Sequence, residues 1–148
     1  MRVVIETPRG SFTKYRLAGE VFARDMRTPF PTLFNYGSVE GEYAGDGMRR
    51  DAIVLGPRLD QGSIVECSNV GRVLFSDAGV EDDKIVGSTR GEIRLGDKIR
   101  IHVFFTTYMV FKTLRYFIVE RRVSFSFYRG LETGLVQEHS VTHTPPST

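Results

Sequence analysis

The chain has 148 residues, of which 41% are hydrophobic and 26% are charged, and its formal net charge is +2. This length fits one domain, and the composition is that of a globular protein rather than a disordered segment. No apolar run approaches the roughly 20 residues of a membrane span. We expect no secretory signal, because charged residues interrupt the N-terminal segment too soon. The single cysteine, Cys67, cannot form an intrachain disulfide, so we expect a reducing, cytoplasmic setting.

Short apolar segments bounded by Gly, Pro, Asp or Ser recur through the first 90 residues. They are 2–7, 13–17, 52–55, 63–66, 69–75 and 84–86. Such segments, rich in Val and Ile, predict β-strands, and their spacing favours a small closed or nearly closed β-structure. No repeat or linker divides the chain. We therefore predict one domain over 1–148, with a flexible tail at 141–148.

The segment 97–118 fits two secondary structures. Five apolar side chains recur at the spacing of one helical face: Ile101, Phe104, Phe105, Tyr108 and Phe111. The many β-branched and aromatic residues equally suit strands. We predict a helix at about 98–114, followed by a strand at 123–128, where VSFSFY alternates with a period of two.

Two acidic turns carry carboxylates that suit a divalent cation. The carboxylates are Asp46 and Asp51 in YAGDGMRRDAIVLG, and Asp77 and Asp82 in SDAGVEDDK. Mg²⁺ takes oxygen ligands, usually a few carboxylates together with substrate phosphates. Lys84 follows Asp82 by two residues and could neutralise a phosphate. Each turn alone is weak evidence because acidic turns are common, but together they hold the ingredients of metal-assisted phosphate chemistry.

The order and the amino-acid sequences of these segments resemble those of the family I soluble inorganic pyrophosphatases. The matching segments are VVIETPRGSFTKY (3–15), FNYG (34–37), DGMRRDAIVLG (46–56), DAGVEDDK (77–84) and FFTTYM (104–109). The first looks like the family's opening strand and first lysine, and FNYG is similar to its Asn-Tyr-Gly turn. The resemblance covers about 2–112 in order. From 113 onward, through 113–140, no family pattern is matched.

The resemblance implies a mainly β (α+β) fold, a small closed OB-like five-stranded β-barrel with a flanking helix. It also implies Mg²⁺-dependent hydrolysis of inorganic pyrophosphate to phosphate, with Mn²⁺ as a possible substitute for Mg²⁺. Family members form homo-oligomers, usually hexamers among bacteria, so we expect a homo-oligomer of that size or smaller. Neither a membrane nor a nucleic acid is an expected partner.

Carried over residue by residue, the resemblance assigns three roles. The expected metal ligands are Glu6, Asp46, Asp51, Asp77 and Asp82. The expected substrate-binding residues are Lys14, Arg24, Tyr36, Lys84 and Tyr108. Asp51 would bridge two metal ions and Tyr36 would lie beside the nucleophile, which makes both of them expected catalytic residues. The four aspartates should then converge in one cleft, where like charges should raise the pKa of at least one carboxyl.

Four functional positions depart from the family pattern, besides Arg49, which replaces the usual proline of the first acidic turn. Met48 stands at the middle aspartate of the first acidic turn, which in the family orients and deprotonates the attacking water. Arg16 replaces a glutamate, Thr32 a tyrosine, and Met109 the phosphate-binding lysine that follows Tyr108. A thioether neither accepts a proton nor binds Mg²⁺ usefully, and losing a general base costs about 10²- to 10⁴-fold in rate. We therefore predict impaired hydrolysis.

Two other functions remain open from the sequence. One is a non-catalytic relative that binds metal and phosphate or uses the barrel as an assembly unit. The other is an OB-like barrel that binds single-stranded nucleic acid through the basic and aromatic segment 104–129. The core-like spacing of those aromatic residues speaks against the second alternative.

Overall fold

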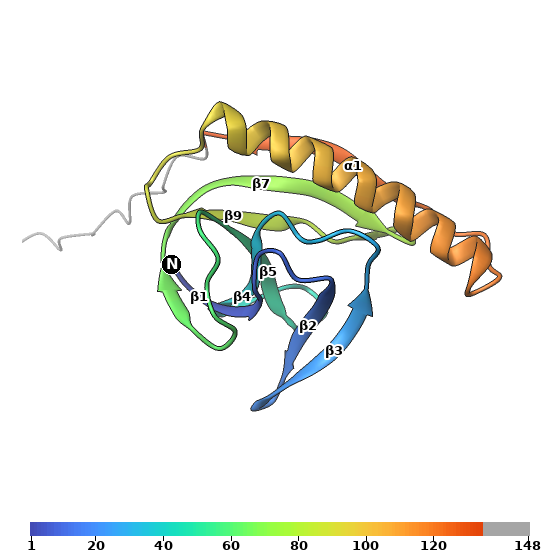
Figure 1. Ribbon diagram of the computed structural model, residues 1–148, viewed down its shortest axis with the longest axis horizontal. Coiled ribbons are helices and arrows are strands. Elements are labelled where there is room, and N and C mark those ends of the chain that lie inside the picture. The colour runs from blue at the N-terminus through green and yellow to red at the C-terminus, as the bar shows by residue number, and fades with distance from the viewer. Residues whose placement is uncertain (135–148) are drawn as a thin grey trace, which may run out of the picture.

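The computed structural model describes residues 1–134, in which a long helix lies across a strongly curved sheet (Figure 1). The tail predicted at 141–148 lies outside the described residues. The elements, in chain order, are β1 (Arg2–Thr7), β2 (Thr13–Ala18), β3 (Val21–Arg27), β4 (Asn35–Tyr43), β5 (Arg49–Leu55), β6 (Ile64–Glu66), β7 (Ser68–Asp77), β8 (Val80–Glu81), β9 (Lys84–Ser88), α1 (Leu95–Ile118) and β10 (Ser126–Thr133). All six predicted early strands and the predicted helix are present, whereas the strand predicted at 123–128 begins only at Ser126.

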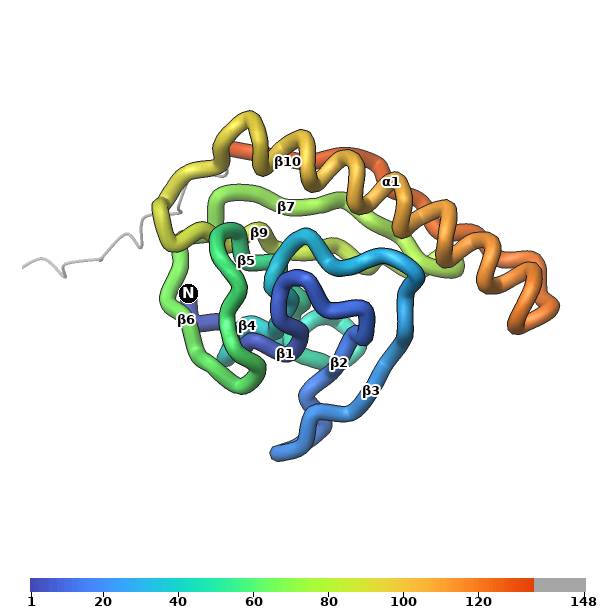
Figure 2. Tube along the Cα trace, in the orientation of Figure 1, coloured from blue at the N-terminus to red at the C-terminus, as the bar shows by residue number. Residues whose placement is uncertain are grey.

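The sheet follows the strand order β10-β7-β9-β5-β4-β1-β6, and β8 pairs with β7. The β2–β3 hairpin forms a separate two-stranded sheet. Among the described residues no hydrogen-bonded pair joins the two ends of the large sheet, so its closure into a five-stranded barrel is not confirmed. Instead, β6 runs into β7 with Cys67 alone between them, and Figure 2 shows this segment turning beside β1. The mainly β, OB-like fold with a flanking helix is confirmed.

Both faces of the sheet are buried, because alternate residues of its central strands enter two different apolar clusters. In β5, Ile53 packs in the cluster beneath α1, while Ala52 and Val54 pack in the cluster on the other face. A strand buried on both faces needs a continuous apolar run, which is what the sequence shows at 52–55. Burial of these apolar side chains is the main favourable contribution to the stability of such a domain.

The helix α1 presents the predicted apolar stripe to the sheet. Ile101, Phe104, Phe105 and Tyr108 are all buried, and the rings of Phe104 and Tyr108 stack with centroids 5.8 Å apart. At its first turn, the backbone N–H of Arg94 donates to the buried carboxylate of Asp97 over 3.0 Å, which caps the helix. No helix among the described residues combines the length and the hydropathy needed to cross a membrane.

The FNYG segment begins strand β4, which corrects the expected Asn-Tyr-Gly turn. Asn35 is fully buried, and its side-chain oxygen accepts the backbone N–H groups of Arg9 (3.0 Å) and Leu59 (2.9 Å). One side chain therefore ties two loops to the sheet. Gly37 faces β1 so closely that an added Cβ would lie 2.1 Å from the carbonyl oxygen of Val4.

Replacing Gly37 with alanine tests this close approach. Because the obstructing atom belongs to the backbone of β1, the strands must separate, and we expect a loss of about 3 kcal/mol in the free energy of unfolding, at the upper end of overpacking costs. Urea denaturation measures the loss. Gly45→Ala is the matched control, since its Cβ would meet nothing within 4 Å. Equal stability of the two variants would contradict the packing argument.

Candidate active site

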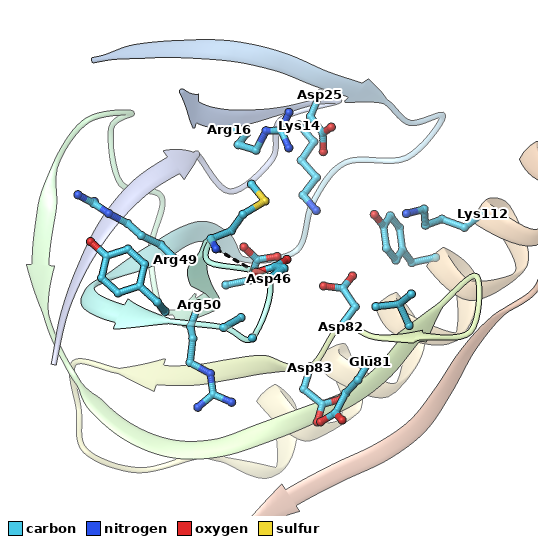
Figure 3. Close-up of a pocket in the computed structure, with 17 residues that line it drawn as sticks. Lys14, Arg16, Asp25, Asp46, Arg49, Arg50, Glu81, Asp82, Asp83 and Lys112 are labelled. Atoms are coloured by element: carbon cyan, nitrogen blue, oxygen red, sulfur yellow. Dashed lines mark hydrogen bonds between the residues drawn. The ribbon is translucent and has the colours of Figure 1, made fainter. Parts of the chain in front are cut away.

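A cavity of about 800 Å³ opens where the β2–β3 hairpin, the β4–β5 turn, the β8 turn and α1 meet (Figure 3). Its lining includes six acidic and five basic side chains, a mixture that suits a polyanion held together with cations. Lys14 and Asp82 point into the cavity from opposite walls, whereas Arg49 and Arg50 extend outward along its rim. The predicted residues that line the cavity are Lys14, Asp46, Asp51, Asp82 and Tyr108.

A buried ammonium group gathers two of the predicted metal ligands. The Nζ atom of Lys84 donates to Asp51 Oδ2 over 3.0 Å and to Asp82 Oδ1 over 2.5 Å, while its side chain is only 1% exposed. The two carboxylates face the cavity above it. Asp46 lies in the adjoining turn, where its Oδ1 accepts the N–H of Met48 over 2.9 Å. Lys84 itself is not among the residues that line the cavity.

Asp77 does not join these carboxylates, so the expected convergence of four aspartates is wrong for this residue. Its carboxylate accepts hydrogen bonds from Tyr116 Oη (2.6 Å), Ser126 Oγ (2.8 Å) and Lys112 Nζ. These partners come from α1 and β10, and they hold Asp77 out of the cavity lining. Within residues 1–134, no three His, Cys, Asp or Glu side chains are placed to hold one metal ion together.

The electrostatics also differ from the expectation of a raised aspartate pKa. Burial opposes the charge of Asp51, but Lys84 and Lys14 outweigh it and lower the pKa of that carboxyl. Burial likewise opposes the charge of Asp77, and the hydrogen bonds from Lys112 and its neighbours lower the pKa of this group too. The raised value belongs to Glu6 on β1, where burial dominates the pKa and Asp51 adds repulsion. Glu6 Oε1 accepts the N–H of Leu17 over 3.0 Å and lies outside the cavity lining.

A cation lies between two aromatic rings on the opposite wall. Lys14 Nζ is 5.0 Å from the ring centroid of Tyr36 and 5.8 Å from that of Tyr108. Burial alone would lower the pKa of Lys14, but Tyr108, Tyr36 and Asp51 raise it above its ordinary value, so the ammonium stays charged. Burial raises the pKa of Tyr36 well above its ordinary value, so its phenol stays neutral. Tyr36 lies beneath Lys14 rather than in the cavity lining.

The β2–β3 hairpin changes which residue faces the cavity. Its register shifts between Lys14 and Tyr15, which pair with Met26 and Arg24 and leave Asp25 as the extra residue of a bulge. Asp25 consequently lines the cavity, while the predicted substrate ligand Arg24 is exposed and does not. A one-residue bulge cannot be read from the sequence pattern, because both strands are short and Met26 is the one nearly fully buried residue in them.

The four departures from the family pattern have different structural settings. Met48 and Arg16 both line the cavity. Thr32 is buried, and its hydroxyl donates to the carbonyl oxygen of Pro8 over 3.2 Å, so it secures the loop after β1. Met109 is turned towards β10, where its sulfur accepts the N–H of Tyr128 over 3.2 Å. A side chain at position 109 therefore packs beneath the helix instead of facing the cavity.

Lys112 is a basic cavity residue to which the sequence analysis assigned no role. It lies on α1 and reaches towards the cavity in Figure 3. Burial would lower the pKa of Lys112, but Tyr108 and Asp77 raise it above its ordinary value. The signal was present in the sequence, since Lys112 follows Tyr108 by four residues and a helix places such residues on one face.

The aromatic residues on which the nucleic-acid alternative partly rested are not available for stacking. Phe104, Phe105 and Tyr108 are each less than 5% exposed and pack between α1 and the sheet. Bases stack on exposed rings, so these three cannot form a binding platform.

The residues present fit a Mg²⁺ ion that completes its shell with water and substrate. Mg²⁺ usually takes only one or two carboxylates from a protein, the rest of its octahedral shell being water and phosphate oxygen. Asp51 and Asp82 supply such a pair because both contact the same nitrogen of Lys84. Asp46 lines the same cavity.

Comparison with known proteins gives one consistent result. The family model for inorganic pyrophosphatase matches residues 3–122. The inorganic pyrophosphatase of Gluconobacter oxydans is 34% identical over 91 residues, 58% of this chain and 53% of that protein. That of Thermus thermophilus is 32% identical over 124 residues, 73% of this chain and 71% of that protein. The chain thus spans about half the length of the first curated relatives it matches.

The solved structures show the same fold. The inorganic pyrophosphatase of Helicobacter pylori superposes with a TM-score of 0.73 at 24% identity, covering 90% of this chain and 84% of that one. The Thermus thermophilus enzyme superposes with a TM-score of 0.74 at 23% identity, covering 90% and 82%. The family model and the matched fold both extend beyond residue 112, which corrects the expectation that the resemblance ends there.

Acidification should destabilise the metal-free chain through its two stabilised aspartates. The pKa values of Asp51 and Asp77 in the fold lie below the ordinary value of 3.8, which the unfolded chain retains. Their contribution to the free energy of unfolding is therefore complete above that ordinary value. It is lost as the pH falls through the pKa values of the folded state. We expect the melting temperature in EDTA to fall between about pH 5 and about pH 2. Asp77→Asn should make the fall shallower, and an unchanged slope would contradict the assignment.

Proposed function

The chain belongs to the inorganic pyrophosphatase family, and from this premise we propose that it hydrolyses inorganic pyrophosphate to phosphate with Mg²⁺, at an impaired rate. The observation that carries the proposal is the cavity itself. On one wall Lys84 holds Asp51 and Asp82 together, and on the opposite wall Lys14 presents a charged ammonium. Carboxylates for cations and a cation for phosphate thus face one another across one space.

Asp51 and Asp82 would hold the Mg²⁺ ion, with Asp46 as a further ligand. Bound Mg²⁺ supplies two effects, a lower pKa for a coordinated water and shielding of the phosphate charge. Lys84 has a positioning role in this arrangement. Its ammonium keeps the two carboxylates close before the metal arrives, which reduces the repulsion that they would otherwise feel.

Lys14 would bind a phosphate oxygen of the substrate. Its ammonium is desolvated and held over Tyr36 and Tyr108, so it is ordered before the substrate binds. Preordered charges in a site with little water stabilise developing negative charge better than mobile solvent does. Tyr36 keeps its proton and supports the ammonium from below.

Neither Asp83 nor Glu42, the two carboxylates close to the site in sequence, takes the place of the missing general base at Met48. Asp83 lines the cavity, but its Oδ1 accepts the N–H of Phe75 over 2.9 Å and its Oδ2 lies 3.8 Å from Arg72. In Figure 3 the side chain of Asp83 points away from Lys14 and Asp46. Glu42 is exposed and lies outside the cavity lining. Without a base at position 48, 83 or 42, the nucleophilic water would depend mainly on the metal, which accounts for the proposed impairment.

A phosphate-release assay with Mg²⁺ or Mn²⁺ tests the proposal. The proposed function requires that phosphate is released from pyrophosphate faster than in buffer alone, and that this release depends on the metal. A thermal-shift assay with pyrophosphate and Mg²⁺ complements it, because a ligand of the native state must raise the melting temperature. A shift without hydrolysis would instead show a non-catalytic member of the family that binds metal and phosphate.

We also propose that the protein is a cytoplasmic homo-oligomer. A reducing compartment fits the single buried cysteine, Cys67. Self-association fits the outer face of α1, where Ile99, Val103, Val110 and Leu114 are all at least half exposed. An apolar stripe of this kind usually marks an interaction surface. Sedimentation velocity would decide the oligomeric state.

Restoring the base is the sharpest mutational test. Because Met48 lines the cavity, Met48→Asp places a carboxylate there, and we expect Mg²⁺-dependent hydrolysis to rise about 10- to 1000-fold, within the range of general-base catalysis. Steady-state kinetics with pyrophosphate measures the change.

Met48→Asn is the matched control, since it has the shape of aspartate without its basicity. It should stay at the parental rate. If the aspartate and asparagine variants hydrolyse pyrophosphate equally at saturating Mg²⁺, the missing base does not limit the reaction.

A further inference from the structure

Two lysines flank the ring of Tyr108 on the cavity wall. Lys14 Nζ lies 5.8 Å from the ring centroid and Lys112 Nζ lies 5.7 Å from it. Lys14 comes from the β2–β3 hairpin and Lys112 from α1, so they approach from different elements, as Figure 3 shows. The side chain of Lys112 is only 14% exposed, so its ammonium is largely removed from bulk solvent.

Helical geometry explains why position 112 carries this cation. A residue four places after Tyr108 lies on the same face of α1, about one turn further along. The next residue, Met109, is rotated by about 100° and contacts β10 through Tyr128. A lysine at 109 would therefore enter the apolar cluster beneath the helix, whereas Lys112 faces the cavity.

The present partner of Lys112, Asp77, does not depend on it alone. Asp77 also accepts hydrogen bonds from Tyr116 (2.6 Å) and Ser126 (2.8 Å), which come from α1 and β10. If Lys112 moved to another anion, Asp77 would keep two donors. A transfer of Lys112 to a phosphate would therefore leave Asp77 hydrogen-bonded rather than unpaired, which limits the cost of breaking the ion pair.

We propose that Lys112 is a substrate-binding residue that grips one phosphate group of pyrophosphate, while Lys14 grips the other phosphate from the far side of Tyr108. This inference rests on the proposed function. Lys112 takes the part of the lysine that the family pattern places directly after Tyr108, one helical turn further along. The substitution at Met109 therefore does not deprive the site of its second cation, and the missing base is the more serious defect.

Calorimetric titration with imidodiphosphate, a pyrophosphate analogue that resists hydrolysis, tests the inference. Lys112→Gln should weaken binding by roughly 10- to 100-fold, the range of one charge-assisted hydrogen bond, both in EDTA and with Mg²⁺. Lys112→Arg keeps the charge and should bind more tightly than the glutamine variant. Lys98→Gln, which removes a lysine of α1 outside the cavity lining, should bind like the parent.

Asp77→Asn separates substrate binding from a purely structural role. This variant breaks the same ion pair but keeps the ammonium of Lys112. In EDTA it should bind imidodiphosphate at least as tightly as the parent, because Lys112 loses its competitor. If Asp77→Asn and Lys112→Gln weaken binding equally, Lys112 serves only the fold and the inference is overturned.

The outcomes also separate this inference from the proposed function. If the parent binds the analogue and Lys112→Gln binds it just as tightly, the assignment of Lys112 fails while pyrophosphate hydrolysis stands. If the parent binds the analogue in neither condition, both fail.

Discussion

The site depends on one buried charge, the ammonium of Lys84. A desolvated ammonium is costly unless carboxylates or other acceptors surround it, and here Asp51 and Asp82 meet that need. Lys84 opens strand β9, which runs parallel to β5 and brings the two carboxylates together from different parts of the chain. The pairing of those strands therefore fixes the wall of the cavity that carries Asp51 and Asp82. On the opposite wall, Lys14 is held by a separate hairpin and Lys112 by α1.

The sequence predicted the central strands well because their apolar runs are continuous. It missed β3 and β4, since β3 is a mostly exposed hairpin arm and β4 is buried only in its first half. The apolar alternation is broken there by Gly37 and Gly41, so no period stands out. The helix prediction succeeded because its apolar stripe extends over several turns. A single strand of ordinary length is too short to contain such a pattern.

The site was predicted in part, and the error at Asp77 shows where a motif stops being informative. Residues whose placement follows from a neighbouring strand or turn, such as Asp51 and Asp82, line the cavity as the motif suggested. Asp77 does not, because Tyr116 and Ser126 bind it, and they lie 39 and 49 residues further along the chain, outside the acidic turn that carries the motif. A local motif specifies which side chain is available. Which groups compete for it is decided by distant parts of the chain.

The joining of β6 to β7 at Cys67 has a consequence for how the chain folds. The strand β1, at the start of the chain, pairs with β4 and with β6, and β7 pairs with β9 and later with β10. These pairings join strands that are separated in sequence. The entropy lost in closing the intervening loops opposes each pairing until many of them form together. During synthesis, β1 must remain unpaired until β4 and β6 leave the ribosome. The helix α1 leaves the ribosome after β1 to β9, so its local hydrogen bonds can form when β10 is the one strand of the described residues still to be added.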